Sequence, residues 1–181
     1  MKKIISILVE NHAGVLSRIS GLFSRRGFNI DSLAVGVTDN PSISRITLVA
    51  TGNEYTIEQL EKQLNKLIEV IKVRTLDNDE LLARELMMVK ISVAAEKRSE
   101  VMTIAEIMNA KVIDISLTSM TLEISDTFFH LSRFEEIIRP YGIIEMVRTG
   151  VVAMERGTST LINNHGDNHS YEMPIAVKMA N

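Results

Sequence analysis

The order of expected secondary structure elements is the feature of this chain that most constrains its fold. Two consecutive segments of similar length both alternate β-rich apolar runs with stretches whose apolar residues recur at helical spacing. In the first segment we expect strands at residues 3–10, 28–38, 43–51 and 68–74, with helices that begin at Val15 and near Thr56. In the second we expect strands at 86–94, 111–118, 120–125 and 143–154, with helices at about 98–109 and 127–139. Both segments therefore follow the order βαββαβ.

This order predicts the α+β fold class, built as two tandem ferredoxin-like βαββαβ sandwiches. Each strand–helix–strand unit packs its helix on one face of a sheet, and two such units complete one sandwich. The acidic, turn-prone run from Leu76 to Glu80 separates the two copies. We therefore expect domains at residues 1–76 and 77–157, followed by a mobile tail at 158–181, where Asn, His, Ser and Thr dominate without a clear period.

Composition excludes several classes of protein. The chain has 181 residues, of which 45% are apolar, so it can bury one core or two small ones. Cysteine is absent, which excludes disulfides, thiolate metal sites and a cysteine nucleophile. A net charge of −3 gives no basic surface for nucleic acid, and no apolar run is long enough to cross a membrane. We expect a cytoplasmic protein that contacts neither nucleic acid nor membrane.

The run from Glu10 to Leu16 is the most informative local stretch, because it joins the end of a strand to the start of a helix. Backbone N–H groups and the positive end of the helix dipole converge there, which suits a carboxylate. Gly14 lets a ligand approach the backbone, and the amide of Asn11 can both donate and accept. Such residues more often simply form a turn, so chemistry alone leaves both roles open.

A second informative stretch contains Asn29 and Asp31 within an expected strand, where both residue types are rare. The apolar phase also changes here, since Phe28 and Ile30 share one face and Leu33 takes the other. A β-bulge near Asp31 would reconcile the two phases. An edge strand with a tolerant exposed side explains the polar residues equally well.

Local sequence signals predict how two helices begin and how the histidines behave. Thr56 to Gln59 has the form of a capping box, and Asp126 is the expected N-cap of the helix at 127–139. His12 and His130 have no evident carboxylate partner and are expected to be capping or packed groups. The tail residues His165, Asp167, His169 and Glu172 have spacing compatible with a metal site, but we expect no metal.

Residues 4–51 closely resemble the ACT domain of acetohydroxyacid synthase (acetolactate synthase) small subunits. The resemblance rests on the runs ENHAGVLSRI at 10–19 and RRGFNIDSL at 25–33. The run RTGVVAMERG at 148–157 is similar to the family's second signature, near the end of its C-terminal domain. Two signatures in separate domains are much more specific than an ACT-like turn alone. The resemblance covers about residues 1–157 and does not extend to the tail.

The resemblance implies an N-terminal ACT domain, a C-terminal ACT-like domain and a homodimer whose ACT domains pair side by side. It also implies an effector, expected to be valine or a related branched-chain amino acid, bound where the two chains meet. One chain would supply the turn and helix start, and the facing chain would supply the beginning of the next strand. The implied effector-binding residues are Asn11, His12, Ala13, Gly14, Val15, Leu16, Asn29 and Ile30.

Catalysis, by the same resemblance, belongs to a separate large subunit that carries thiamine diphosphate, Mg²⁺ and FAD. The present chain would hold no cofactor and no catalytic residue, but would activate the large subunit and confer feedback inhibition. The sequence contains no dinucleotide or phosphate-binding glycine motif and no zinc-protease or nucleophile-elbow motif. Two alternatives stay open: a free-standing ACT sensor with another target, and a small enzyme on a ferredoxin-like fold.

Overall fold

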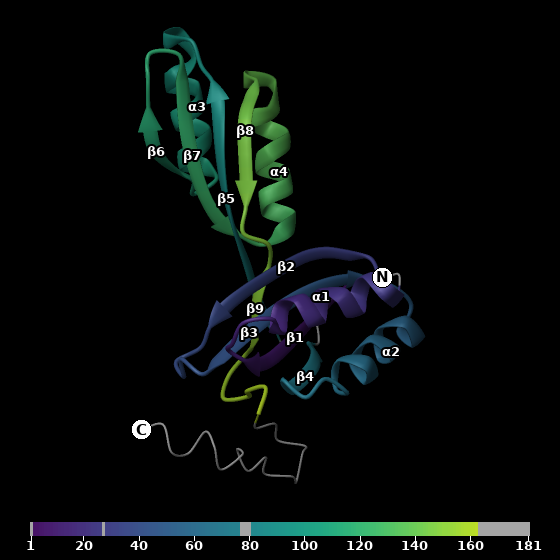
Figure 1. Cartoon of the computed structure of the whole chain (residues 1–181). Coiled ribbons are helices and arrows are strands. Elements are labelled where there is room, and N and C mark those ends of the chain that lie inside the picture. The colour runs from purple at the N-terminus through teal and green to yellow at the C-terminus, as the bar shows by residue number, and fades with distance from the viewer. Residues whose placement is uncertain (1, 27, 77–80, 163–181) are drawn as a thin grey trace. The chain divides into compact units, whose positions relative to one another are not determined.

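The computed structural model describes residues 2–26, 28–76 and 81–162 of the chain (Figure 1). It divides into two compact units. Among the described residues, the first contains those up to Leu82 together with 153–162, and the second contains residues 83–152.

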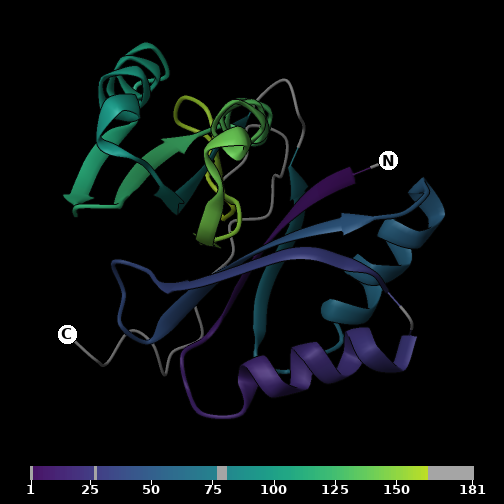
Figure 2. The ribbon, with the colours of Figure 1, turned by 90° about the horizontal axis from the view of Figure 1, so that it is seen from above.

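The first unit is an antiparallel sheet with two helices on one face (Figure 2). Its strands lie in the order β2-β3-β1-β4, so β2 and β4 are the edges. The elements are β1 Lys2–Glu10, α1 Val15–Arg26, β2 Ile30–Val37, β3 Ile43–Thr51, α2 Glu54–Leu64 and β4 Val70–Leu76. This is the predicted βαββαβ order. The expected bulge is also confirmed, because the register between β2 and β3 shifts between Ile30 and Ser32.

The core of the first unit lies between the sheet and its helices. From β1, Ile5, Ile7 and Val9 pack against the apolar faces of α1 and α2. The residues between them, Ser6 and Leu8, are also buried, so β1 is covered on both faces as its apolar sequence predicts. Each fully buried aliphatic side chain contributes roughly 1.5–3 kcal/mol by leaving water. The α1 residues in this core are Val15, Ile19, Leu22 and Phe23.

The start of α2 differs from the sequence-based expectation. The capping box predicted from Thr56 to Gln59 is wrong, because the helix begins at Glu54 with Asn53 as its N-cap. Asn53 Oδ1 accepts from the backbone N–H of Thr56 at 2.8 Å and from the Thr56 hydroxyl at 2.7 Å. Asn is at least as good an N-cap as Thr, and starting the helix earlier adds a turn with Glu54 near the positive dipole end.

The second unit repeats the arrangement with a sheet in the order β6-β7-β5-β8, and β9 pairs with β5. Helices α3 and α4 pack their apolar residues on one face of this sheet (Figure 1). The elements are β5 Leu81–Ser92, α3 Arg98–Ile107, β6 Lys111–Ile115, β7 Ser119–Asp126, α4 Phe128–Ile138 and β8 Ile143–Arg148, with 3₁₀ turns at Ala95–Lys97 and Arg139–Tyr141. The short strand β9, Val152–Glu155, follows, and its residues from Ala153 belong to the first unit.

Two details of the second unit correct the sequence-based expectation. Thr127, not Asp126, is the N-cap of α4, and its side chain accepts from the backbone N–H of His130. The single strand expected at 143–154 is divided into β8 and β9, because Gly150 adopts a positive φ of 80° between them. The core of this unit includes the methionines Met87, Met108 and Met120.

The two sheets with their helices confirm the predicted α+β fold class of tandem ferredoxin-like sandwiches. The compact units divide the chain differently from the predicted domains, since residues 153–162 belong to the first unit. The domain boundaries at 76 and 157 therefore stay a prediction. The part of the expected tail beyond Ile162 lies outside the described residues.

The N-cap of α2 gives a direct test of this assignment. Replacing Asn53 with Ala should lower the free energy of unfolding by about 1 kcal/mol, because one backbone N–H loses its partner. Gln59→Ala, which would break a capping box starting at Thr56, should cost much less. Urea unfolding followed by circular dichroism measures both, and an equal loss for the two variants would contradict the Asn53 cap.

Candidate functional site

The turn after β1 is held by the side chain and backbone of Asn11. Its backbone N–H donates to Ser42 O at 2.8 Å, and its Nδ2 donates to Pro41 O at 2.8 Å. Both acceptors lie in the link that leads into β3. The amide nitrogen of Asn11 is thus engaged in holding the turn, and its Oδ1 is the atom suited to accept from a ligand ammonium.

Gly14 sets the backbone path into α1 with a φ of +92°. This value lies where L side chains are strained, so the position favours glycine. A Cβ placed on Gly14 would meet no atom within 4 Å, so the space beside it is open. Before it, exposed His12 contacts Glu10, with Nε2 3.1 Å from Glu10 Oε2, and Ala13 is also exposed. The turn therefore presents accessible backbone to solvent.

The first turn of α1 combines backbone donors with an apolar side chain. Val15 is buried in the core, whereas Leu16 is exposed beside the turn. The first turn of α1 contains no acidic residue. The N–H groups of Leu16 and Ser17 precede the first donor of an intrahelical bond, Arg18, whose N–H donates to Gly14 O at 3.0 Å, and they lie at the positive end of the helix. This end of α1 is chemically suited to an external carboxylate.

Asn29 and Ile30 lie at the beginning of β2, next to the bulge. Asn29 Nδ2 donates to Asp31 Oδ1 at 3.0 Å, which directs the carbonyl oxygen of Asn29 away from that contact. Asp31 also accepts from the Thr51 hydroxyl at 2.7 Å and pairs with Lys2 at 3.3 Å. The hydroxyl of Thr51 and then Lys2 lower the pKa of Asp31, although burial opposes them. Asp31 is therefore ionised at neutral pH and holds the amide of Asn29.

The predicted site residues fall into two groups at opposite ends of the first sheet. Glu10 pairs with Ile43, so the turn from Asn11 to Gly14 lies at one end of β3. Ile30 pairs with Ala50, at the other end of β3. A strand of this length spans roughly 25 Å at about 3.3 Å per residue. One chain alone therefore cannot bring Asn29 to the turn.

Strand β2, which Asn29 directly precedes, is an edge strand of the sheet. Its exposed residues include Val35 and Val37, whose side chains are 47% and 60% exposed. An apolar edge strand with unpaired backbone groups is a template for pairing with another strand.

An ion pair that sequence analysis missed braces the same end of the sheet. Arg18 of α1 pairs with Glu69, whose side chain is largely buried. The backbone N–H of Glu10 also donates to Glu69 O at 2.9 Å. Glu69 thus links the ends of β1 and α1 to the start of β4. The partners lie 51 residues apart, so no local pattern in the sequence points to the pair.

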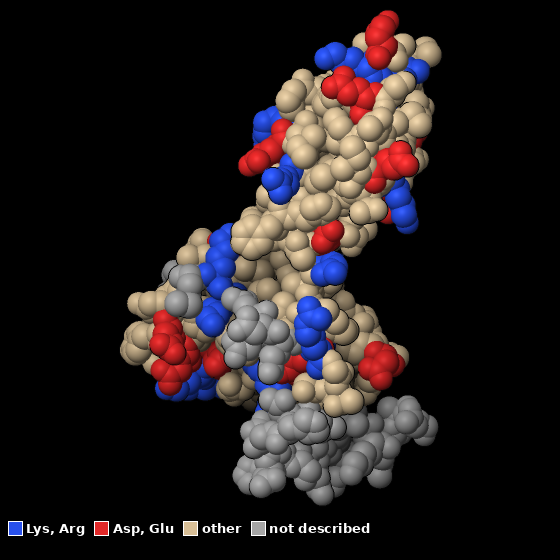
Figure 3. Space-filling view, turned by 180° about the vertical axis from the view of Figure 1, so that it is seen from behind, with Lys and Arg blue, Asp and Glu red and all other residues tan. Residues whose placement is uncertain are grey.

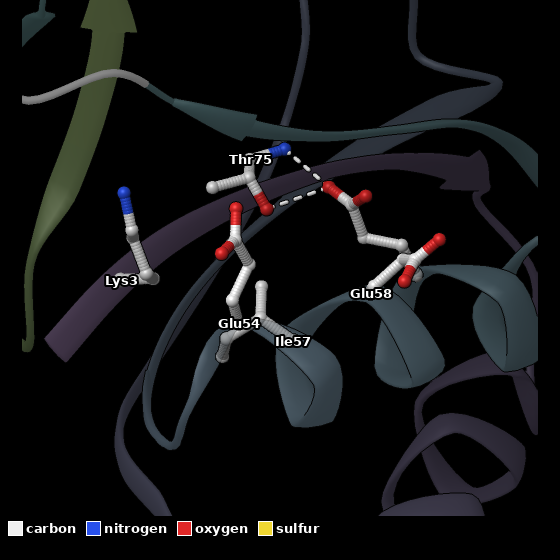
Figure 4. A pocket seen from close by; sticks show the side chains of 6 residues that line it. Lys3, Glu54, Ile57, Glu58 and Thr75 are labelled. Atoms are coloured by element: carbon white, nitrogen blue, oxygen red, sulfur yellow. Dashed lines mark hydrogen bonds between the residues drawn. The ribbon is translucent and has the colours of Figure 1, made fainter. Parts of the chain in front are cut away.

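A shallow pocket lies elsewhere, between α2 and the strands β1 and β4 (Figure 4). Glu61 Oε1 accepts from the backbone N–H and the hydroxyl of Thr75 at 2.7 and 2.6 Å. The other lining residues are Lys3, Glu54, Ile57 and Glu58. None belongs to the predicted effector site. The hydrogen bonds from Thr75 to Glu61 connect α2 to β4, which gives Glu61 a structural role.

The histidines differ from the sequence-based expectation. His12 contacts Glu10, and His130 Nδ1 lies 2.6 Å from Asp126 Oδ2, so both have carboxylate partners. The spacing of four residues between Asp126 and His130 on a helix start could have revealed the second pair. The backbone N–H of Thr127 and then contact with His130 lower the pKa of Asp126, although burial opposes them.

Metal-binding clusters and membrane-spanning helices are both absent from the described part of the chain. No group of three His, Asp or Glu residues is placed to hold a metal ion there. The candidate metal-ligand set in the tail, His165 to Glu172, lies outside the described residues. Within residues 2–26, 28–76 and 81–162, no helix is both long and apolar enough to span a bilayer. Basic and acidic side chains are interspersed on the visible face of each unit (Figure 3).

A βαββαβ sandwich with an open edge strand and a ligand-accessible turn at the head of its first helix is typical of the ACT class of regulatory domains. Residues 5–72 match the family described as the AHAS small subunit-like ACT domain. Residues 84–157 match the family described as the small subunit of acetolactate synthase.

Individual relatives agree with these two matches. The chain is 45% identical over 159 residues to a probable acetolactate synthase small subunit of Methanothermobacter thermautotrophicus, covering 87% of this chain and 95% of the relative. It is 42% identical over 158 residues to the acetolactate synthase isozyme 3 small subunit of Escherichia coli, covering 87% and 97%. The crystal structure of the acetolactate synthase small subunit from Thermotoga maritima superposes with a TM-score of 0.82 at 35% identity, over 88% of this chain and 99% of that one. The chain belongs to the family of acetolactate synthase small subunits.

Alanine substitutions at two glycines, one in the turn and one within α1, test whether the backbone conformation of the turn requires glycine. A Cβ at Gly14 and at Gly21 of α1 would both enter open space. Gly14→Ala should nevertheless destabilise the chain by about 1–3 kcal/mol, because an L residue is strained at its positive φ. Gly21→Ala should stabilise it by roughly 0.5–1 kcal/mol through helix propensity. Thermal or urea unfolding measures both changes, and a stabilising Gly14→Ala would contradict the backbone assignment.

Proposed function

We propose that this chain is a regulatory subunit that binds valine or a related branched-chain amino acid, activates the catalytic large subunit and confers feedback inhibition on it. In this proposal residues 1–76 form the ACT domain that dimerises and binds effector, and residues 77–157 form the C-terminal domain. Membership of the acetolactate synthase small subunit family supports the role. The placement of Asn11 and Asn29 at opposite ends of one sheet supports a site shared by two chains.

Pairing of β2 with its copy in a second chain would complete the site. Around a two-fold axis the two edge strands run antiparallel, so the beginning of one lies beside the end of the other. The end of β2, at Val37, lies at the same end of the sheet as the turn, because Val37 pairs with Ser44. Antiparallel pairing of β2 with its copy would therefore bring Asn29 and Ile30 of one chain toward the turn of the other. A homodimer is the smallest assembly that satisfies this geometry.

The chemistry of the two groups fits an α-amino acid. The effector carboxylate would take the N–H groups of Leu16 and Ser17 at the start of α1. Its ammonium would donate to the carbonyl oxygens of Asn11 and Asn29, whose amide nitrogens are engaged within their own chain. Leu16 and Ile30 offer apolar surface for a branched side chain. Valine, leucine and isoleucine would differ by only about 1–3 kcal/mol in such a pocket.

The catalytic partner in this proposal is the large subunit, which carries thiamine diphosphate, Mg²⁺ and FAD and joins pyruvate to a second 2-oxo acid. The second unit is where we expect that partner to bind. Its sheet and helices expose several large apolar side chains, including Met88, Met102 and Phe129. Exposed apolar groups concentrated on one unit are typical of a protein interface.

Two other functions receive less support. A free-standing ACT sensor would not need the second unit, yet residues 84–157 match the small-subunit family. A small enzyme on this fold would need a nucleophile and base or a metal, and among the described residues no three His, Asp or Glu side chains are placed to hold a metal ion. Turnover by the purified chain alone would revive the enzyme alternative.

Calorimetric titration of the purified chain tests the effector site. We expect saturable binding of valine, with leucine, isoleucine, serine and aspartate as comparisons. Asn29→Ala should weaken binding by roughly tenfold or more, because a hydrogen bond to a charged group contributes about 1.5–3 kcal/mol. Asn65→Ala, at the exposed end of α2, is the matched control and should bind as the parent does. Equal binding by the parent and Asn29→Ala would show that the site assignment is wrong.

Reconstitution with the catalytic large subunit tests the regulatory role. Adding the small subunit should raise the specific activity, and valine should then lower it. Gly14→Asp should keep the activation and lose the inhibition, because its carboxylate would repel that of the effector. The absence of any change in activity on mixing the two subunits would contradict the proposed role.

A further inference from the structure

Residues 153–162 follow the second unit in sequence but form part of the first unit. Arg45 of β3 makes the first attachment, since its Nη2 donates to Ala153 O at 2.8 Å. Arg45 alternates with Ile46 and Leu48, which face the helices, so it projects from the opposite face of the sheet. Ala153 and Leu161 are buried there. The segment therefore covers the sheet face that α1 and α2 leave open.

Arg74 of β4 makes the second attachment to the same segment. Its Nη1 lies 3.1 and 3.3 Å from the carboxylate oxygens of Glu155 and donates to Thr160 O at 3.3 Å. The side chains of Arg74 and Glu155 are each only 14% exposed. Separating a buried ion pair would leave an uncompensated charge in the protein interior, which is strongly destabilising. This cost keeps Arg74 and Glu155 together. We call Arg45, Arg74, Ala153 and Glu155 the rear clamp.

The charge of Glu155 acts on the arginines of both attachments. Burial lowers the pKa of Arg45, and the negative charge of Glu155 partly offsets that effect. Arg45 Nε also donates to Ser6 Oγ at 2.9 Å, which fixes the guanidinium against the central strand. The clamp thus spans β1, β3 and β4 and depends on the carboxylate of Glu155.

The rear clamp is only a few residues from the proposed effector turn. Asn11 donates to the oxygens of Pro41 and Ser42, and β3 begins at the next residue, Ile43. Arg45 is two residues further along the same strand. On the neighbouring strand Leu8 pairs with Arg45, two residues before β1 ends at Glu10. The turn and Arg45 are therefore connected through the adjoining ends of β1 and β3.

We propose that the rear clamp couples the effector turn to residues 153–160, and through them to the end of the second unit. This inference rests on the proposed effector function and adds the route by which binding is transmitted. Arg45 and Arg74 are positioning residues in this device, because they touch the segment and not the effector. Loss of the clamp would leave the effector site intact, but residues 153–160 would no longer respond to effector binding.

The test measures effector binding and the response of the segment in the full chain. Valine affinity comes from calorimetry, and the segment is followed by amide hydrogen exchange of residues 153–156 with and without saturating valine. In the parent, valine should change the exchange rates by at least about fivefold, the lower end of usual allosteric coupling. In Glu155→Gln, which keeps the shape and removes the charge, that response should disappear while valine affinity changes little. Arg45→Lys, which keeps the charge but loses the forked contacts, should behave in the same way.

Lys62→Gln is the matched control, because it removes a cation from an exposed ion pair on α2 of the same unit. It should respond to valine as the parent does. Unchanged exchange in the parent on valine binding, or a full response in Glu155→Gln and Arg45→Lys, would overturn the coupling. Absence of valine binding by the parent in calorimetry would instead overturn the proposed function, and the coupling with it.

Discussion

The antiparallel register of β1, β2 and β3 is the constraint on which the rest of the account depends. It places the turn after β1 and the start of β2 at opposite ends of one sheet. Each group carries an Asn whose amide nitrogen is used internally and whose carbonyl oxygen suits a ligand ammonium. The turn also supplies the N–H groups suited to a carboxylate, and the start of β2 supplies a second acceptor for the ammonium. The proposed effector site, the dimer and the transmission of binding all follow from that separation.

The spacing of apolar residues predicts the helices and strands well, because buried positions recur every two residues in a strand and every three or four in a helix. The βαββαβ order, the stripe of α1 and the bulge near Asp31 all follow from patterns within a few residues. Both predicted cap positions are wrong, because Asn53 and Thr127 have neighbours of similar capping propensity. The choice depends on where the packed face of each helix begins, which is a property of the whole unit.

The turn and Asn29 of the candidate site can be predicted from the sequence, whereas the long-range contacts around them cannot. The pair of Arg18 with Glu69 and the clamp of Arg74 on Glu155 join residues far apart along the chain. No local pattern encodes such contacts. The return of residues 153–162 to the first unit is likewise invisible in the sequence, although their resemblance to the family's second signature marked them as important. The structure gives that signature a physical role in covering the first sheet.

The central claim is that each effector site is built from two chains, and a purified heterodimer tests it most directly. One differently tagged chain would carry Gly14→Asp and the other Asn29→Ala, so each homodimer has both sites damaged. A heterodimer of two-fold symmetry-related sites would have one site with both defects and one intact site. Calorimetry should then find about half of the parent's valine-binding capacity at near-parental affinity, since one of two sites is intact. A heterodimer that binds no better than either homodimer would contradict a shared site and place the whole site within one chain.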